Sequence, residues 1–73
     1  MSNPNAHIRR TIKTLLTKRA MSAERLAYEA GVSKGYMYGY LKGGPKHNNI
    51  GILTLQKIAK GLEVSLKDLL PSD

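Results

Sequence analysis

The sequence predicts an all-α fold, a compact five-helix bundle in a single domain, 1–73. Through most of the chain, apolar residues recur three or four positions apart, which is the period of a helix with one buried face. Only the tyrosines at 36, 38 and 40 alternate as a strand would, and the sequence offers them no partner strand. Because 73 residues give a thin core, nearly every apolar helix position has to be used.

The first helix is expected to begin near Pro4, which suits a first turn, with Asn3 or Asn5 as its N-cap. It carries one apolar stripe, formed by Ile8, Ile12, Leu15 and Leu16. Three cations lie off this stripe: Arg9, Arg10 and Lys13. A basic amphipathic helix can bind a membrane surface or a calmodulin-like groove. Since the next helix follows at once, we expect the stripe to pack against the bundle instead.

The second and third helices are joined by a very short turn. Ser22 is a suitable N-cap for the second helix, with Glu24 in the first turn, where the helix dipole favours an acid. Gly31 ends that helix because glycine readily takes the positive φ of the turn, and Ser33 caps the next helix two residues later. Such a pair predicts a helix-turn-helix over about residues 22–42. The residues expected to face its core are Leu26, Ala27, Ala30, Val32, Met37 and Tyr40.

The third helix contains Gly35 and Gly39, each of which costs roughly 1 kcal/mol relative to alanine inside a helix. With Met37, Tyr40 and Leu41 facing inward, both glycines are expected on the outward side. Gly43 should lie on that side too and end the helix as its C-cap glycine.

A polar loop rich in turn formers, residues 43–49, separates the third helix from a fourth. An apolar stripe marks the fourth helix, formed by Ile52, Leu55, Ile58, Ala59 and Leu62. Ser65, with Asp68 three residues later, resembles a capping box and predicts a short fifth helix that Pro71 ends. This last helix carries three leucines, Leu66, Leu69 and Leu70.

The positive charge is confined to one part of the chain. Up to residue 46 there are nine lysines and arginines against two acids, which accounts for the whole formal net charge of +7. From residue 47 onward three lysines balance three acids. This asymmetry is expected of a surface that binds a polyanion, and a solvated surface that merely aids solubility is the alternative.

Several classes of function find no support in the composition. There is no cysteine for a disulfide or a thiolate metal site, and two isolated histidines, His7 and His47, do not form a metal site. No apolar run approaches the roughly 20 residues of a membrane span, and residues 1–5 lack the apolar core of a signal peptide. No nucleophile–base pair or phosphate-cradling motif points to an enzyme. We expect a soluble cytoplasmic protein without metal, cofactor or small-molecule ligand.

The apolar and glycine positions resemble those of the Cro/C1-type (XRE-like) helix-turn-helix family of DNA-binding proteins. The resemblance covers about residues 8–70 and rests on three runs: Leu26-Ala27-x-x-Ala30-Gly31-Val32-Ser33, Met37-x-x-Tyr40-Leu41-x-Gly43, and Leu55-x-x-Ile58-Ala59-x-x-Leu62-x-Val64-x-Leu66-x-x-Leu69. In length and around Tyr36-Met37 the chain looks similar to restriction–modification controller proteins, and a short phage-type repressor is the alternative. The resemblance implies a lambda-repressor-like fold.

It also implies a function. Proteins of this kind bind double-stranded DNA sequence-specifically and regulate transcription, with the third helix in the major groove. We therefore expect a repressor-like homodimer on a palindromic site, in the cytoplasm and associated with the nucleoid. The dimer is expected to use the fifth helix and neighbouring surface, with Leu66, Leu69 or Leu70 as candidate contacts, and core packing is the expected role of at least two of these leucines. The alternative is a helix-turn-helix antitoxin or adaptor that acts mainly through a protein partner.

The chain departs from the family pattern in three places. The family usually has a phosphate-binding glutamine where this chain has Ala23. It often pairs an arginine of helix 1 with a glutamate after helix 3, at positions that here hold Leu16 and Leu41. We expect these leucines to touch, since replacing a buried ion pair by an apolar contact is often neutral or stabilising. The third departure concerns the residues that read bases.

Family members read bases from the positions of Lys34, Gly35, Tyr38 and Gly39. Because glycine has no side chain, direct readout is expected from Lys34, which can donate to guanine O6 and N7. Tyr38 can touch a thymine methyl or donate a hydrogen bond, and packing on a neighbour is its alternative role. Contacts to phosphates are expected from Ser22, Ser33, Tyr36, Lys42, Lys46 and Asn49, although residues 46–49 can also be a surface insert. Arg9 and Arg10 are expected farther from the DNA.

Overall fold

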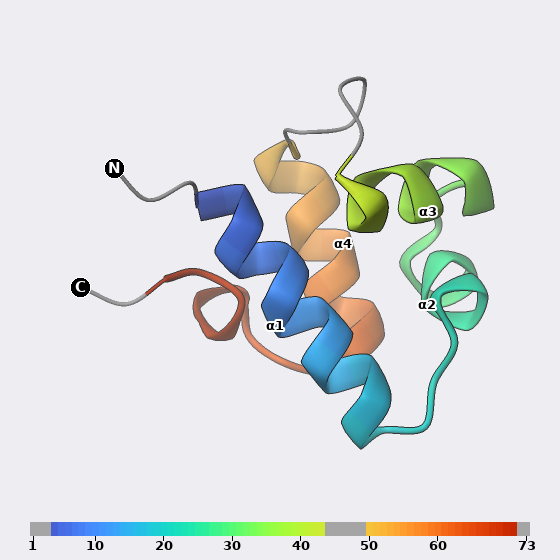
Figure 1. Cartoon of the computed structure of the whole chain (residues 1–73), viewed down its shortest axis with the longest axis horizontal. Coiled ribbons are helices and arrows are strands. Elements are labelled where there is room, and N and C mark those ends of the chain that lie inside the picture. Colours follow the sequence, from blue (N-terminus) through green and yellow to red (C-terminus); the bar gives the residue numbers. More distant parts are fainter. Residues whose placement is uncertain (1–3, 44–49, 72–73) are drawn as a thin grey trace.

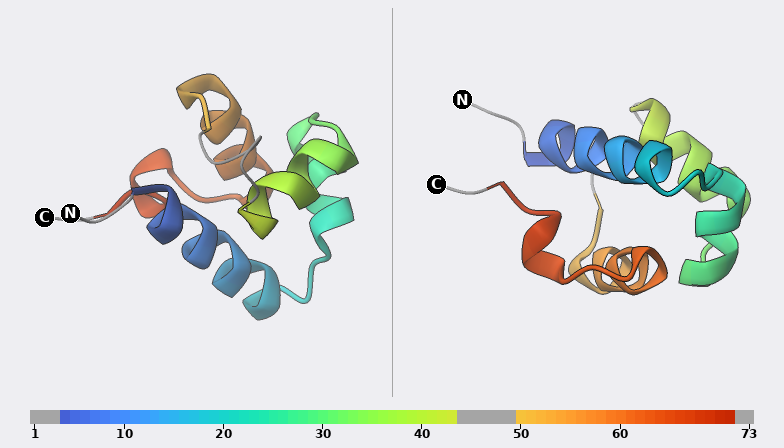
Figure 2. Two further views of the ribbon diagram at one scale, coloured as in Figure 1. Left: turned by 45° about the horizontal axis from the view of Figure 1, so that its top comes forward. Right: turned by 90° about the horizontal axis from the view of Figure 1, so that it is seen from below.

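Four α-helices and one turn of 3-10 helix make up the part of the chain that the computed structural model describes, residues 4–43 and 50–71. In chain order these are α1 (Pro4–Lys18), α2 (Ala23–Ala30), α3 (Lys34–Lys42), α4 (Ile52–Leu62) and η2 (Leu66–Asp68). No strand occurs within these ranges, so the tyrosine stretch is helical, as predicted. Helices α1 and α4 form two layers, and α2 and α3 lie across one end (Figures 1 and 2). The start of α1 and η2 lie at the opposite end.

One face of each α-helix, together with Leu69, forms the apolar core. Its buried residues are Ile8, Ile12, Leu16, Leu26, Ala27, Ala30, Met37, Tyr40, Leu41, Leu55, Ile58, Ala59, Leu62 and Leu69. The predicted stripes are confirmed except at their edges, where Leu15 is only half-buried and Ile52 remains 55% exposed. Leu16 and Leu41 both belong to this core, so they do not lie on opposite surfaces.

The helix-turn-helix forms through the caps that the sequence predicts. The Ser22 and Ser33 hydroxyls accept hydrogen bonds from the backbone N–H groups of Arg25 and Tyr36, each at 3.0 Å. Gly31 has φ +72°, and its N–H donates to carbonyl groups of the last turn of α2. Because these local interactions end one helix and start the next, three residues are enough for the whole turn.

Close approach of α2 and α4 depends on Gly61, which the sequence analysis did not single out. A β-carbon at this position would lie 3.1 Å from Leu26 Cδ1 and 3.3 Å from the backbone nitrogen of Ala30. The leucine tip can move, but the backbone of α2 cannot, so a larger residue would push the two helices apart. Gly61 therefore sets how closely the helix-turn-helix packs on α4.

The predicted fifth helix is wrong in type: it is a single 3-10 turn, η2. Its backbone bonds span three residues, as in Leu69 N–H to Leu66 O at 3.0 Å, because too few residues lie between the capping box and Pro71 for an α-helix. The capping box itself is confirmed. The Asp68 carboxylate accepts from the Ser65 hydroxyl (2.9 Å) and N–H (3.1 Å), and these hydrogen bonds lower the pKa of Asp68.

Of the two predicted N-caps of the first helix, the structure describes one, Asn5. Asn5 lies within α1, one residue after its start at Pro4, so it is not the cap. Asn3 lies outside the described residues.

Each α-helix is followed by a residue in the left-handed region, and two of these residues are not glycine: Ala20 (φ 52°) and Glu63 (φ 60°). We expect Glu63→Gly to raise the free energy of unfolding by about 0.5–1 kcal/mol, because glycine takes this conformation without strain. Denaturant unfolding checks the value. Glu63→Ala is the control: it keeps the strain and removes only the acid at the helix C-terminus, so a gain equal to that of glycine would contradict the backbone explanation.

Candidate nucleic-acid interface

The outward face of α3 carries the side chains that the sequence analysis assigned to DNA. Lys34, Tyr38 and Lys42 follow each other at i, i+4 and i+8 and are exposed, with Tyr38 at 48%. Beside them, Gly35 is exposed, and apart from the adjoining residues and backbone of α3 itself no described atom lies within 4 Å of where its β-carbon would be. Gly39, four residues further on, lies on the same outward side by helical period and is half-buried. The part of this face that is both exposed and bare of a side chain is therefore Gly35, in the first turn of the helix.

Lys34 is exposed but not isolated. Its Nζ lies 3.8 Å from Glu24 Oε2, with side-chain exposures of 61% and 65%. This contact joins the first turns of α2 and α3. An ion pair so exposed to water contributes at most about 1 kcal/mol and weakens with salt, so a phosphate or a base can compete with Glu24 for the ammonium group.

The predicted phosphate contacts fall into four groups. Ser22 and Ser33 use their oxygens as acceptors in the helix caps, which leaves the O–H of each hydroxyl to donate to another group. Tyr36 is half-buried and packs against the core, so the structure gives it a packing role on one side. Lys42 is exposed at the end of α3. Lys46 and Asn49 lie outside the described residues.

Arg9 occupies a position that the sequence analysis did not foresee. Its Nε donates to the carbonyl oxygen of Tyr40 at 2.7 Å, and its guanidinium carbon lies 4.9 Å from the centroid of the Tyr40 ring. A β-carbon on Gly43 would lie 3.6 Å from the same guanidinium group. Arg9 therefore places a positive charge at the C-terminus of α3, where the helix dipole is negative.

Tyr40 completes this link between α1 and α3. Its ring is fully buried, and its hydroxyl donates to Asn5 Oδ1 at 3.0 Å, so the polar end of the side chain is satisfied. Burial raises the pKa of the Tyr40 phenol above its usual value, and the charge of Arg9 opposes that shift. The phenol stays protonated at neutral pH and keeps its donor role.

Lys13, which the sequence analysis left outside the site, joins the α3 face across a shallow depression. The lining residues are Lys13 from α1 and Tyr38, Leu41 and Lys42 from α3. The sequence of α3 alone could not have predicted that Lys13 lies beside its exposed face. The i, i+4 spacing of Arg9 and Lys13 does predict that these two side chains share one side of α1. Once Arg9 lies against the end of α3, Lys13 follows on the same side of α1.

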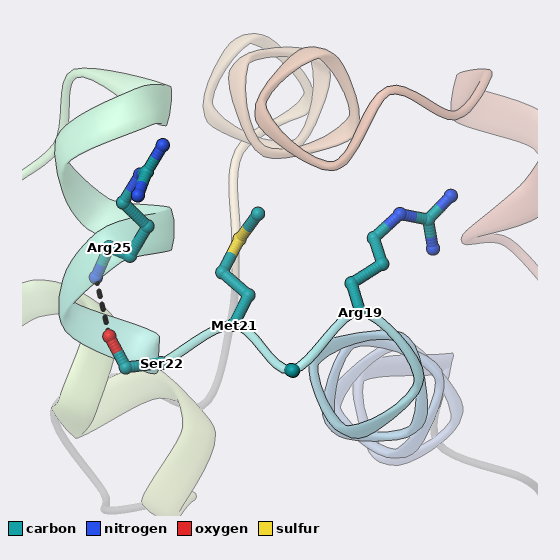
Figure 3. A pocket seen from close by; sticks show the side chains of 5 residues that line it. Arg19, Met21, Ser22 and Arg25 are labelled. Carbon is teal, nitrogen blue, oxygen red and sulfur yellow. Dashed lines mark hydrogen bonds between the residues drawn. The ribbon is translucent and has the colours of Figure 1, made fainter.

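A second basic depression lies at the junction of α1 and α2, where Arg19 and Arg25 flank Met21 and Ser22 (Figure 3). Here Arg25 Nε donates to Glu29 Oε2 at 3.0 Å, so one of the two positive charges is already partly compensated. We therefore centre the candidate interface on α3 rather than on this junction.

Two other kinds of feature are absent from the described residues. Among residues 4–43 and 50–71, no group of three or more histidine, cysteine, aspartate or glutamate side chains could hold a metal ion. Within the same ranges, no helix is both long and apolar enough to cross a membrane.

Comparison with known proteins gives the class. A family model of the Cro/C1-type helix-turn-helix DNA-binding domain matches residues 11–71, and the chain therefore belongs to this family. The resemblance seen in the sequence is thus confirmed. Among curated proteins, no sequence matches the chain.

Two solved structures of restriction-modification controller proteins are similar to the chain. One is C.AhdI from Aeromonas hydrophila, with a TM-score of 0.78 and 23% identity over 89% of this chain and 94% of that chain. The other is wild-type C.Esp1396I, with a TM-score of 0.76 and 28% identity over 100% of both chains. At 23% identity, the first likeness is one of fold.

We expect Arg9→Met to lower the free energy of unfolding by about 1–2 kcal/mol, because the Tyr40 carbonyl loses a charged donor and the ring loses its cation. Denaturant unfolding measures the change. Arg10→Met is the matched control on the same helix, at an exposed position, and should change stability by less than about 0.5 kcal/mol. Equal effects of the two substitutions would contradict a specific role of Arg9.

Proposed function

We propose that the protein binds double-stranded DNA sequence-specifically and regulates transcription, with α3 in the major groove. The observation that carries the proposal is the exposed row of Lys34, Tyr38 and Lys42 on α3, in a chain of the Cro/C1-type family. The bare first turn at Gly35 allows the backbone of α3 to approach base edges closely. The likeness to C.Esp1396I over the full length of both chains supports a regulator of the controller type.

The direct test is a selection of bound fragments from a library of random duplexes, followed by a salt titration on the selected sequence. The proposal expects a defined site and an affinity that falls steeply with salt, because binding releases counterions from the phosphates. Binding without sequence preference would contradict specific recognition. Absence of binding at low salt would contradict DNA binding altogether and favour a protein partner.

Lys34 is the residue that we expect to read a base. Lys34→Ala should cost about 1–3 kcal/mol of discrimination at one base pair of the selected site, while affinity for scrambled duplex changes less. Competition binding with single-base variants measures this. Lys60→Ala, an exposed lysine of α4, is the control and should leave discrimination unchanged. An equal loss on selected and scrambled duplexes would show that Lys34 contacts phosphate instead.

We also propose a homodimer that binds a palindromic site. Of the three candidate contacts of the fifth helix, Leu69 is fully buried and Leu66 is half-buried, which leaves Leu70, at 37% exposure, as the residue able to meet a second copy. Since η2 lies at the end of the molecule opposite α3, a contact there leaves the DNA-binding face uncovered (Figures 1 and 2). Two copies would read two half-sites about one helical turn apart.

We expect Leu70→Lys to lower the fraction of dimer, because a charge replaces an apolar side chain at the contact. Sedimentation equilibrium measures the mass. Tyr28→Lys is the control, since Tyr28 is exposed at 82% on α2 and is not part of the proposed contact. If Leu70→Lys keeps the dissociation constant of the wild type, the contact lies elsewhere.

A further inference from the structure

The depression between α1 and α3 combines two kinds of lining. Lys13 and Lys42 come from different helices and supply positive charge, while Tyr38 and the edge of Leu41 supply an apolar wall. None of the described residues that line it is acidic. Of the two acids in the helix-turn-helix, Glu24 lies against Lys34 and Glu29 against Arg25, so neither compensates these lysines.

The position of this depression is fixed by the same contacts that attach α3 to α1. Arg9 holds the carbonyl end of α3 through Tyr40, and Lys13 follows Arg9 by one helical turn. Lys13 is therefore held beside the second half of α3, on the side where Tyr38 and Lys42 are exposed.

We propose that this depression seats one sugar–phosphate unit of duplex DNA. In this arrangement Lys13 and Lys42 contact the phosphate, and the deoxyribose lies against Tyr38 and Leu41. The inference rests on the proposed function and extends it in two ways. It adds Lys13, and with it helix α1, to the interface, and it assigns Tyr38 to the DNA backbone rather than to a base.

The chemistry of the lining favours this occupant. A phosphate flanked by deoxyribose presents an anion beside an apolar surface, and the depression presents two ammonium groups beside an aromatic ring and a leucine. Contacts of this kind position a protein on the duplex without reading sequence. Discrimination between bases then falls mainly on Lys34 at the other end of α3.

The test uses the full chain and the duplex obtained by selection. We expect Lys13→Gln to reduce the slope of log affinity against log salt by about 0.9, and to weaken selected and scrambled duplexes by the same factor. Lys18→Gln is the matched control: it removes the same charge from the same helix, roughly 140° around the axis from Lys13, and should leave the slope unchanged.

Neutral methylphosphonate linkages, introduced one at a time, locate the phosphate. We expect one linkage to remove the effect of both Lys13→Gln and Lys42→Gln, because both lysines contact the same phosphate. Tyr38→Ala should weaken binding without changing the selected sequence. Thermal unfolding of each variant confirms that the exposed substitutions leave the fold intact.

The outcomes separate this inference from the proposed function. If the wild type binds no duplex, DNA binding fails and the inference fails with it. If the wild type binds but Lys13→Gln keeps the full salt slope, the inference alone is overturned. The inference alone is also overturned if different methylphosphonate linkages remove the effects of Lys13→Gln and Lys42→Gln. It is likewise overturned if Tyr38→Ala relaxes the preference for one base pair.

Discussion

The position of α3 depends on Tyr40. This residue is fully buried, and α1 supplies partners for two of its polar groups: Asn5 accepts from its hydroxyl, and Arg9 donates to its carbonyl, which also accepts from Gly43 N–H. A helix of nine residues with two glycines gains little stability from its own backbone. Its geometry is therefore imposed by tertiary contacts, and Tyr40 is where α1 supplies them.

Because the buried side of α3 holds the helix in place, the residues on its exposed side are not needed to position it. The inward side is filled by Met37, Tyr40 and Leu41, all buried, so the exposed side needs no residue for stability. The exposed side can therefore carry a glycine, which leaves the backbone accessible, and long basic side chains, which extend away from the helix. On the far side of the helix-turn-helix, Gly61 keeps α4 close to α2, so the two helices of the motif are supported from both layers.

Local features of the fold could be predicted from the sequence, because they depend on residues a few positions apart. The caps at Ser22, Ser33 and Gly31 are of this kind, and so are the apolar stripes. The exposed row on α3 followed from its helical period. The length of the last helix did not, since a capping box marks where a helix starts but not whether enough residues follow to close α-helical turns.

Other features depend on pairs far apart in the chain, which periodicity cannot place. Arg9 and Tyr40 are 31 positions apart, and the bond between them has a backbone acceptor, so no pattern of side chains signals it. Lys13 was missed for the same reason, because it meets the exposed face of α3 only when α1 lies against α3. Gly61 was overlooked because a glycine inside a helix indicates close packing only when the neighbouring helix is known.

The contact between Lys34 and Glu24 has a consequence for how association responds to ionic strength. In the free protein the charge of Lys34 is partly cancelled at long range, so attraction toward a distant polyanion comes mainly from cations such as Lys13 and Lys42. The ammonium group of Lys34 exerts its full charge when another anion displaces Glu24. Added electrolyte therefore has two opposite effects: it screens the long-range attraction toward a polyanion, and it weakens the ion pair in which Glu24 competes for the Lys34 ammonium group.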